Sequence, residues 1–345
     1  MKKVIALMLS LLLIFAFVAC STEPESEEVT GTTEIKITDV TGREITLPQI
    51  ATKVVGTHNP SLNAVVVLGG GEKYIAGFGN KEMSRGLYSE VIKNYDDLVQ
   101  IGKAGNINYE SVIATGADLA VLPERFKDQA DKFSEVGVNA LIALPNRESF
   151  DTVKASLAMI GQALGEDERA SAINAFLDSK ITKAQEISSK AADKPSVLFL
   201  GGSSPLSVAP AAMIQTQLIE TAGGTNAVSD VDGEGDFIEV NIEQIIAWNP
   251  DVIWFPSYTD YTAEDLLNNP AWSSIDAVKN KKVYRFPSTL EPWDQPTAAL
   301  ALGISWATYS LHPDLYTFED MMGDADEFYN LVYGRTFTAE QLGVD

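Results

Sequence analysis

Two segments of this chain have nearly the same sequence although they lie far apart. In residues 108–119 and 241–252, Asn, Glu, Ile, Ala and Asp recur in the same order and spacing. Each segment runs directly into a short apolar stretch that is typical of a buried strand. A repeat separated this widely predicts two similar lobes, each of which presents one acidic residue at the same place, Glu110 or Glu243.

The first twenty residues have the organisation of a secretory signal. Lys2 and Lys3 precede an apolar run over residues 4–19, and Cys20 follows it. A basic start, an apolar middle and a small residue before the cut are typical of a signal peptide. The run is also too short for an ordinary membrane-spanning helix. We therefore expect residues 1–19 to be removed on export.

Cys20 is the only cysteine, which excludes a disulfide framework. The stretch Phe-Val-Ala-Cys over residues 17–20 resembles a bacterial lipobox, in which the cysteine is lipidated, although Leu is usual where Phe17 stands. The alternative is an ordinary signal peptide with a chance cysteine. Residues 20–34 are polar and acidic and predict a flexible tether. The expected protein is held by lipid, its one covalent addition, on the outer face of the cytoplasmic membrane.

The acidic balance and the length limit the function and the number of lobes. The chain has 48 acidic and 25 basic residues, a formal net charge of −23, which argues against nucleic acid and anionic lipid as partners. A body of this size is larger than one compact core usually is. We expect an N-terminal α/β lobe over residues 35–150, connecting helices over 151–192 and a C-terminal α/β lobe over 193–345.

Within both lobes, short apolar strands alternate with helices. This alternation predicts mostly parallel sheets that are covered on both faces. Residues 151–192 instead carry apolar side chains at helical spacing with few breakers, which predicts a shorter helix and then a long, rigid strut between the lobes. The tail over residues 328–334 is expected to pack on the second lobe.

Motifs for catalysis are missing from the sequence. It has no Gly-x-Ser-x-Gly, no His-Glu-x-x-His and no phosphate loop. The two histidines are His58 and His312, and His312 lies before a proline at a predicted helix end, where a structural role is expected. An enzyme is therefore not expected, and a binding function is favoured.

His58 lies at the end of a predicted strand, just before a helix that Ser61 is expected to cap. Ligands of open α/β sheets bind at such strand ends. A neutral imidazole there can hydrogen-bond a ligand or coordinate a metal, and the alternative is a loop histidine that bonds only to its own backbone. Asn59 follows it in the same loop.

Other predicted strand-end loops are rich in basic, aromatic and small polar residues. The arginines are suited to an anionic chelate, whereas Trp293 and Tyr258 are suited to stacking on a flat ligand face. His58 and Tyr258 are the possible metal ligands. Each residue alone is also compatible with an ordinary surface position. The full set of candidate ligand-binding residues is His58, Asn59, Arg85, Arg125, Arg147, Ser203, Tyr258, Trp293 and Asp294.

The repeated glutamates have two explanations. Asn108 and Asn241 are good helix caps, so Glu110 and Glu243 fall in the first turn, where the helix dipole favours a carboxylate whatever its function. The functional alternative is that the two carboxylates meet matching arginines on a two-fold symmetric partner, because such pairs fix orientation and register.

Several segments together resemble a known family. They are residues 39–48 (DVTGREITLP), 221–227 (TAGGTNA), 241–251 (NIEQIIAWNPD) and 327–334 (EFYNLVYG). Their order and spacing resemble the class III substrate-binding proteins of ATP-driven importers, which carry iron–siderophore complexes, haem and cobalamin. The resemblance covers the whole body after the signal.

The resemblance implies a fold and a set of partners. It implies a monomer with two α/β lobes joined by one long helix, and a ligand between the lobes. It also implies that Glu110 and Glu243 dock onto arginines of an ABC permease dimer, which works with a cytoplasmic ATPase. The first copy departs from the pattern at Gly116 and Ala117, where the second has Asn249 and Pro250.

The ligand has two leading hypotheses. A chelated metal, of the iron–siderophore, haem or corrinoid type, is the first. Residues 58–63 and the helix after residues 293–296 also resemble the branch of the family that binds molybdate or tungstate, so an oxyanion is the alternative; the loop over residues 256–259 has no arginine, which argues against it. A surface sensor or adhesin without a transport role is a further alternative. The ligand loops are expected on the side opposite the two Asn–Glu helices.

Overall fold

The computed structural model describes residues 34–79, 86–103, 106–228, 231, 233, 235–256, 258–287 and 289–344. The predicted signal peptide, Cys20, residues 21–33 of the predicted tether and Arg85 lie outside the described residues. Within the described part of the chain, no helix combines the length and the apolar character that a membrane span requires.

The first sheet has five parallel strands in the order β5-β4-β3-β8-β9. Its strands are short and apolar, as expected for a sheet buried on both faces; every residue of β8 is buried. A hairpin of β1 (Ile35–Thr38) and β2 (Glu44–Leu47) precedes the sheet. The strands of the sheet are β3 (Val54–Gly56), β4 (Ile75–Phe78), β5 (Val99–Gln100), β8 (Leu119–Pro123) and β9 (Asn139–Leu144).

The second sheet has four parallel strands in the order β12-β10-β14-β15. Its central pair, β10 and β14, corresponds to β3 and β8 of the first sheet. The short helices of the repeat, α4 (Tyr109–Thr115) and α9 (Ile242–Trp248), come before β8 and β14. Two similar α/β sheets therefore confirm the predicted fold class. The strands are β10 (Ser196–Phe199), β12 (Thr225–Asn226), β14 (Val252–Phe255) and β15 (Val283–Arg285).

The repeated aspartates join the helix of each repeat to the neighbouring strand. Asp118 accepts hydrogen bonds from the backbone N–H groups of Thr52 and Lys53, just before β3. Asp251 accepts the equivalent bond from the N–H of Ser196, the first residue of β10, at 2.9 Å. The aspartate of the repeat therefore has a structural explanation, because it aligns the equivalent pair of strands in each lobe.

The departure between the two copies also has a local explanation. Both short helices end at a residue in the left-handed region, Gly116 with φ 65° and Asn249 with φ 43°. Glycine adopts this conformation without strain, and asparagine is among the residues that tolerate it best. The two sequences therefore make the same helix ending with different residues.

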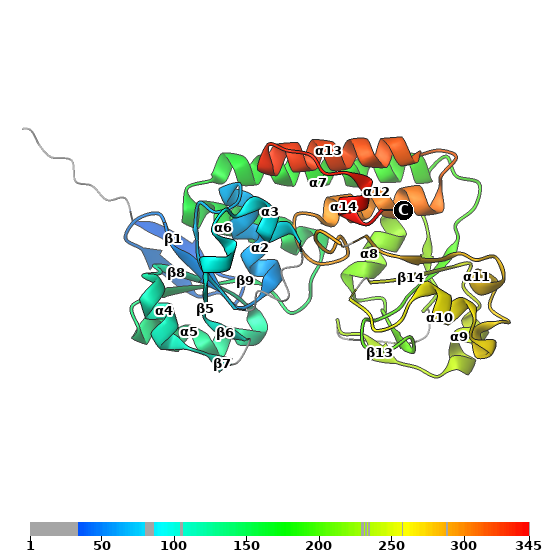
Figure 1. Cartoon of the computed structure of the whole chain (residues 1–345), viewed down its shortest axis with the longest axis horizontal. Coiled ribbons are helices and arrows are strands. Elements are labelled where there is room, and N and C mark those ends of the chain that lie inside the picture. Colours follow the sequence, from blue (N-terminus) through cyan, green and yellow to red (C-terminus); the bar gives the residue numbers. More distant parts are fainter. Residues whose placement is uncertain are drawn as a thin grey trace, which may run out of the picture. The chain divides into compact units, whose positions relative to one another are not determined.

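Two helices connect the sheets. α6 (Phe150–Leu164) ends at Gly165, which has φ 68°, and α7 (Asp167–Ser188) follows directly. The predicted order of a shorter helix and then a long one is therefore confirmed. α7 packs on α6 and on two helices from the end of the chain, α12 (Leu300–Leu311) and α13 (Phe318–Tyr333), and Figure 1 shows α7 and α13 side by side.

The tail of the chain contacts elements of both halves. α13 packs on α7 and α12 but also contacts α2 (Asn59–Gly69), which belongs to the first lobe. Just beyond α13, Arg335 pairs with Glu90 at 3.0 Å, and the Arg169 side chain bonds the carbonyl of Val332. The prediction that the tail packs on the second lobe is confirmed by its contacts with α12, but the tail also contacts the first lobe, and one continuous apolar core runs from α2 through α7 to α13.

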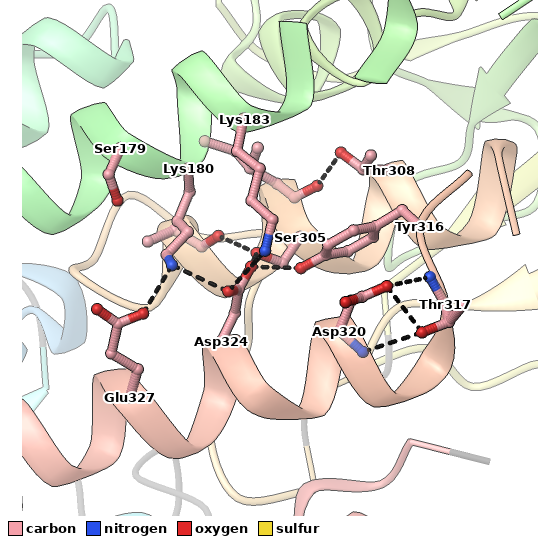
Figure 2. A network of polar contacts seen from close by, with 12 residues as sticks. Ser179, Lys180, Lys183, Ser305, Thr308, Tyr316, Thr317, Asp320, Asp324 and Glu327 are labelled. Carbon is pink, nitrogen blue, oxygen red and sulfur yellow. Dashed lines mark hydrogen bonds and ion pairs between the residues drawn. The ribbon is translucent and has the colours of Figure 1, made fainter. Parts of the chain in front are cut away.

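A buried polar network fixes α7 to α12 and α13. The Asp324 carboxylate accepts hydrogen bonds from the Lys180 ammonium at 2.9 Å, the Lys183 ammonium at 3.1 Å and the Ser305 hydroxyl at 2.9 Å. Tyr316 donates to the same carboxylate, and Glu327 binds Lys180 from the next turn of α13. Figure 2 shows these side chains converging on Asp324.

The remaining elements are short. The other α-helices are α2 (Asn59–Gly69), α3 (Leu87–Val91), α5 (Ala130–Glu135), α8 (Ile214–Thr221), α10 (Ala263–Leu267), α11 (Asp276–Lys279) and α14 (Ala339–Leu342). Two small antiparallel pairs join β6 (Gly102–Lys103) to β7 (Asn106–Ile107) and β11 (Ser207–Val208) to β13 (Ile238–Glu239). The 3₁₀ segments are η2 (Tyr95–Asp97), η3 (Glu124–Gln129) and η4 (Pro270–Trp272).

Candidate functional site

A small pocket opens where β3 and β4 end. The two loops come very close together, because the Gly79 N–H donates to the Gly56 carbonyl at 2.7 Å. A Cβ atom on Gly79 would lie 2.4 Å from Cα of Thr57, so only glycine fits there. The buried Thr57 hydroxyl in this pocket has no hydrogen-bond partner among the described residues. The lining residues are Gly56, Thr57, His58, Asn59, Leu62, Phe78 and Gly79.

His58 is the N-cap residue of α2, which begins earlier than predicted. Pro60 occupies the first turn, where its missing N–H costs nothing. The predicted cap, Ser61, lies inside the helix, and its hydroxyl bonds Nδ1 of His58 at 3.0 Å. That prediction is wrong because the proline allows the helix to start before Ser61.

Both ring nitrogens of His58 are engaged. Nε2 contacts a guanidinium nitrogen of Arg125 at 2.5 Å. A guanidinium only donates, so Nε2 accepts and Nδ1 carries the proton that goes to Ser61. Burial, and next the charge of Arg125, lower the pKa of His58 to about 3. The imidazole is therefore neutral at ordinary pH and holds Arg125 in place.

Arg125 itself is exposed at the carboxyl end of β8. Its charge also acts on Glu148, a partly buried residue that follows β9. Burial raises the pKa of Glu148 to about 7, which Arg125 partly opposes and Asp236 reinforces. Arg147, next to Glu148, is exposed. His58, Asn59, Arg125 and Arg147 thus lie at the carboxyl ends of adjacent strands of the first sheet.

The candidates of the second lobe form a separate group. The Tyr258 hydroxyl donates to the Asp294 carboxylate at 3.0 Å, and Asp294 is fully buried. The Tyr258 ring lies against Gly202, because a Cβ on that glycine would be 2.7 Å from a ring carbon. Ser203, the next residue, is exposed.

Trp293 lies in the core. Its side chain is 1% exposed and its indole N–H donates to the Tyr329 hydroxyl of α13 at 3.2 Å. An indole enclosed on both faces does not offer the open face that stacking requires, so this placement does not support the expected ligand contact. Among the described residues, no three His, Cys, Asp or Glu side chains cluster closely enough to hold a metal ion.

Sequence reasoning missed three groups in this region. Thr57 and Glu148 are ordinary polar residues in sequence, and their only signal is that each follows a strand of the first sheet. Glu291 stands in a loop that the sequence analysis considered, but its burial comes from partners far away: the Asn63 amide donates to it at 3.2 Å across 228 residues of sequence.

The glutamates of the repeat are both exposed, and their helices are built alike. The Asn108 side chain accepts from the N–H of Ser111 at 3.1 Å, and the Asn241 side chain accepts from that of Gln244 at 2.8 Å. Both predicted caps are therefore confirmed. Glu110 and Glu243 each stand in the first turn.

The two Asn–Glu helices begin near the carboxyl ends of the strands, where the ligand candidates also lie. The Asn108 N–H donates to the carbonyl of Ile101, directly after β5, and β5 is parallel to β3, which leads to His58. In the second sheet, the Val240 N–H donates to the carbonyl of Leu206 in the loop after β10. The prediction of opposite sides is therefore wrong, because both kinds of residue follow carboxyl ends of parallel strands.

Comparisons with known proteins agree with this architecture. A family model described as periplasmic binding protein matches residues 57–290. The molybdate-binding protein MolA of Haemophilus influenzae is 23% identical, over 87% of this chain and 91% of that protein. The Fe(3+)-citrate-binding protein YfmC of Bacillus subtilis is 25% identical, over 82% of this chain and 89% of that protein.

A solved structure of a periplasmic solute-binding protein from Veillonella parvula has a TM-score of 0.79 and 22% identity, covering 90% of this chain and 96% of the other. MolA bound to molybdate has a TM-score of 0.76 and 20% identity, with coverage of 88% and 99%. The extent of the family match shows that this chain belongs to the periplasmic binding proteins, as the solute-binding, non-enzymatic component of an ABC importer.

Proposed function

We propose that the protein binds a compact oxyanion, of the molybdate or tungstate type, beside His58 and Arg125, and delivers it to its importer. The observation that carries this proposal is the pairing of a neutral imidazole with an exposed guanidinium. Because Nε2 of His58 accepts one N–H of Arg125, the remaining guanidinium N–H groups keep a defined direction. Such a fork suits two oxygens of one anion.

Two further features of the pocket favour an anion. α2 begins at the pocket, and the free N–H groups of a helix N-terminus attract negative charge. The Thr57 hydroxyl, unpartnered among the described residues, can donate to a bound oxygen. These groups act at short range, whereas the repulsion from the net charge of −23 is largely screened beyond about 8 Å in physiological salt.

The oxyanion replaces the chelated metal as the leading hypothesis. Direct coordination by His58 would require Nε2 to release Arg125, and the buried Trp293 offers no stacking surface. An anionic chelate is the second candidate. The observation that favours it is that Arg125 and Arg147 are both exposed, on neighbouring strand ends, where together they suit several carboxylates. The names of relatives include both a molybdate binder and an Fe(3+)-citrate binder.

Thermal-shift and calorimetric titration of the mature protein will distinguish the candidates. The panel holds molybdate, tungstate, sulfate, phosphate, ferric citrate, a ferric siderophore, haem and cobalamin. A ligand present at about 100 times its Kd stabilises the protein by roughly 2.7 kcal/mol. We expect molybdate or tungstate to raise the midpoint. A shift by ferric citrate without any response to either oxyanion would reject the first candidate in favour of the second.

Arg125→Gln tests whether this arginine binds the anion, and Arg147→Gln is its control. Loss of a charged hydrogen bond to the anion is expected to weaken binding about tenfold or more. Arg147→Gln should bind molybdate nearly as well as the wild type. Equal loss in both variants would indicate that the two arginines act together on a larger ligand.

The anchor and the docking role complete the proposal. Cys20 becomes the lipidated first residue after removal of residues 1–19, and the mass of the mature protein purified from membranes tests this. Glu110 and Glu243 dock on the permease; their equivalent, exposed positions in the two lobes support this role. A sensor or adhesin without a transport role would bind the solute equally well but would bind no permease.

A further inference from the structure

The two short helices of the repeat share a second feature, which helix capping does not explain. Among the described residues, few large apolar side chains are exposed. Two of these occupy the same position of the repeat: Ile113, which is 57% exposed, and Ile246, which is 38% exposed. A single exposed isoleucine is ordinary, but an exposed isoleucine at the same place in both lobes needs a common cause.

Each isoleucine lies on the same helix face as the glutamate of its copy. Ile113 follows Glu110 by three residues, and residues at this spacing are neighbours on a helix surface. Ile246 stands in the same relation to Glu243. The apolar residue between them in each copy points the other way, since Val112 and Ile245 are completely buried.

The folding of each lobe requires only part of this pattern. The buried residue fills the core, and the helix dipole favours the glutamate. The exposed isoleucine contributes to neither. Its apolar surface stays in contact with water in the free protein. That surface contributes favourable free energy only when a partner covers it.

We infer that the isoleucines belong to the docking surface: each lobe presents one Glu–Ile pair to one half of the importer's permease. This inference rests on the proposed docking role and extends it. The glutamate meets a basic group and sets the register, while the isoleucine enters an apolar depression beside that group and supplies contact that salt does not weaken.

The charge of the surface limits which partner fits. A second copy of this chain would bring glutamate against glutamate, and an anionic lipid surface would repel a protein of net charge −23. A partner with two equivalent surfaces, each with a basic group beside an apolar depression, fits both copies at once. A dimeric permease has this symmetry.

The test uses the ligand-free full chain and the permease–ATPase complex of the same importer in lipid nanodiscs, with binding measured at about 0.05 M and about 0.3 M salt. The variants are Ile113→Ser/Ile246→Ser and Glu110→Gln/Glu243→Gln. Ile50→Ser/Leu315→Ser is the matched control, since both of its side chains are 46% exposed outside the repeat. Unchanged thermal midpoints establish that each variant is folded.

We expect the isoleucine variant to bind at least about tenfold more weakly at both salt concentrations, because apolar contact is insensitive to salt. The glutamine variant should lose affinity mainly at low salt. Binding by the isoleucine variant within twofold of the wild type, or an equal loss in the control, would overturn the inference and leave the docking role intact. Failure of the wild type to bind the complex would overturn both.

Discussion

Two buried carboxyl groups in the second half of the chain have pKa values that are shifted in opposite directions. Asp324 and Glu291 are 5% and 4% exposed. Burial by itself would raise the pKa of Asp324, but the Tyr316 hydroxyl and the Lys180 and Lys183 ammonium groups outweigh it, so the pKa is lowered. Burial raises the pKa of Glu291 to about 7, against only partial opposition from Tyr329 and Asn63.

The difference between the two sites shows what decides the charge of a buried acid. Both carboxyls receive hydrogen bonds from neutral groups, but only Asp324 also receives two cations. Neutral donors reduce the cost of burying a carboxylate without cancelling it, whereas a paired cation can reverse the balance. Asp324 is therefore an ion-pair acceptor between helices, and Glu291 is a neutral acid at mildly acidic pH.

The largest effect is expected from Asp324→Ala. This variant leaves Lys180, whose side chain is only 7% exposed, without its buried partner. Removing one member of a buried pair typically costs about 3–5 kcal/mol, so we expect a loss of that size in the free energy of unfolding, measured with urea at pH 7. Glu319→Gln on the same helix is the control, and it should cost no more than about 0.5 kcal/mol. A loss below about 1 kcal/mol in Asp324→Ala would mean that Glu327 alone satisfies Lys180.

The second prediction concerns Glu291. Its effect on the free energy of unfolding should depend on pH in the opposite sense to that of Asp324, because the two pKa values are shifted in opposite directions. The ordinary pKa of a glutamate is 4.5, and the folded value is about 7. Between these values the folded state binds more protons than the unfolded state, so stability falls as pH rises through this range and levels off above it. A shift of this size corresponds to about 3 kcal/mol.

Glu291→Gln removes this titration because its amide stays neutral. The variant should match the wild type near pH 4.5 and exceed it by up to about 3 kcal/mol at pH 8. Urea unfolding across this pH range provides the measurement, and Asp324→Asn provides the contrast: its loss relative to the wild type should shrink as pH falls below about 4. A constant difference between Glu291→Gln and the wild type at all pH values would show that Glu291 keeps its ordinary pKa in the folded protein.

The contrast also indicates how far sequence reasoning reaches in this chain. Local signals predicted the alternation of strands and helices, the caps Asn108 and Asn241, and the short-then-long pair of connecting helices. All of these depend on residues within a few positions of one another. The repeat was equally visible, and its aspartates proved to align β3 with β8 and β10 with β14.

Features that depend on distant partners were not predictable. Glu291 is buried by Asn63 and Tyr329, and Trp293 is enclosed because α13 returns across the core. Arg125 meets His58 across 67 residues of sequence. A list of candidate residues at strand ends therefore did not separate Arg125, which contacts a histidine beside a pocket, from Trp293, which fills the core.

The smallest effect is expected from Lys183→Met, which tests which cation keeps Asp324 ionised. The Lys183 side chain is 40% exposed, whereas that of Lys180 is 7% exposed. Solvent-exposed ion pairs contribute about 0–1 kcal/mol, and methionine keeps most of the packing against Tyr316. We expect the free energy of unfolding at pH 7 to fall by less than about 1 kcal/mol, as measured beside Asp324→Ala in the same urea series. A loss as large as that of Asp324→Ala would instead assign the stabilisation to the exposed lysine, and the difference between the two acids would then rest on Lys183 rather than on the buried Lys180.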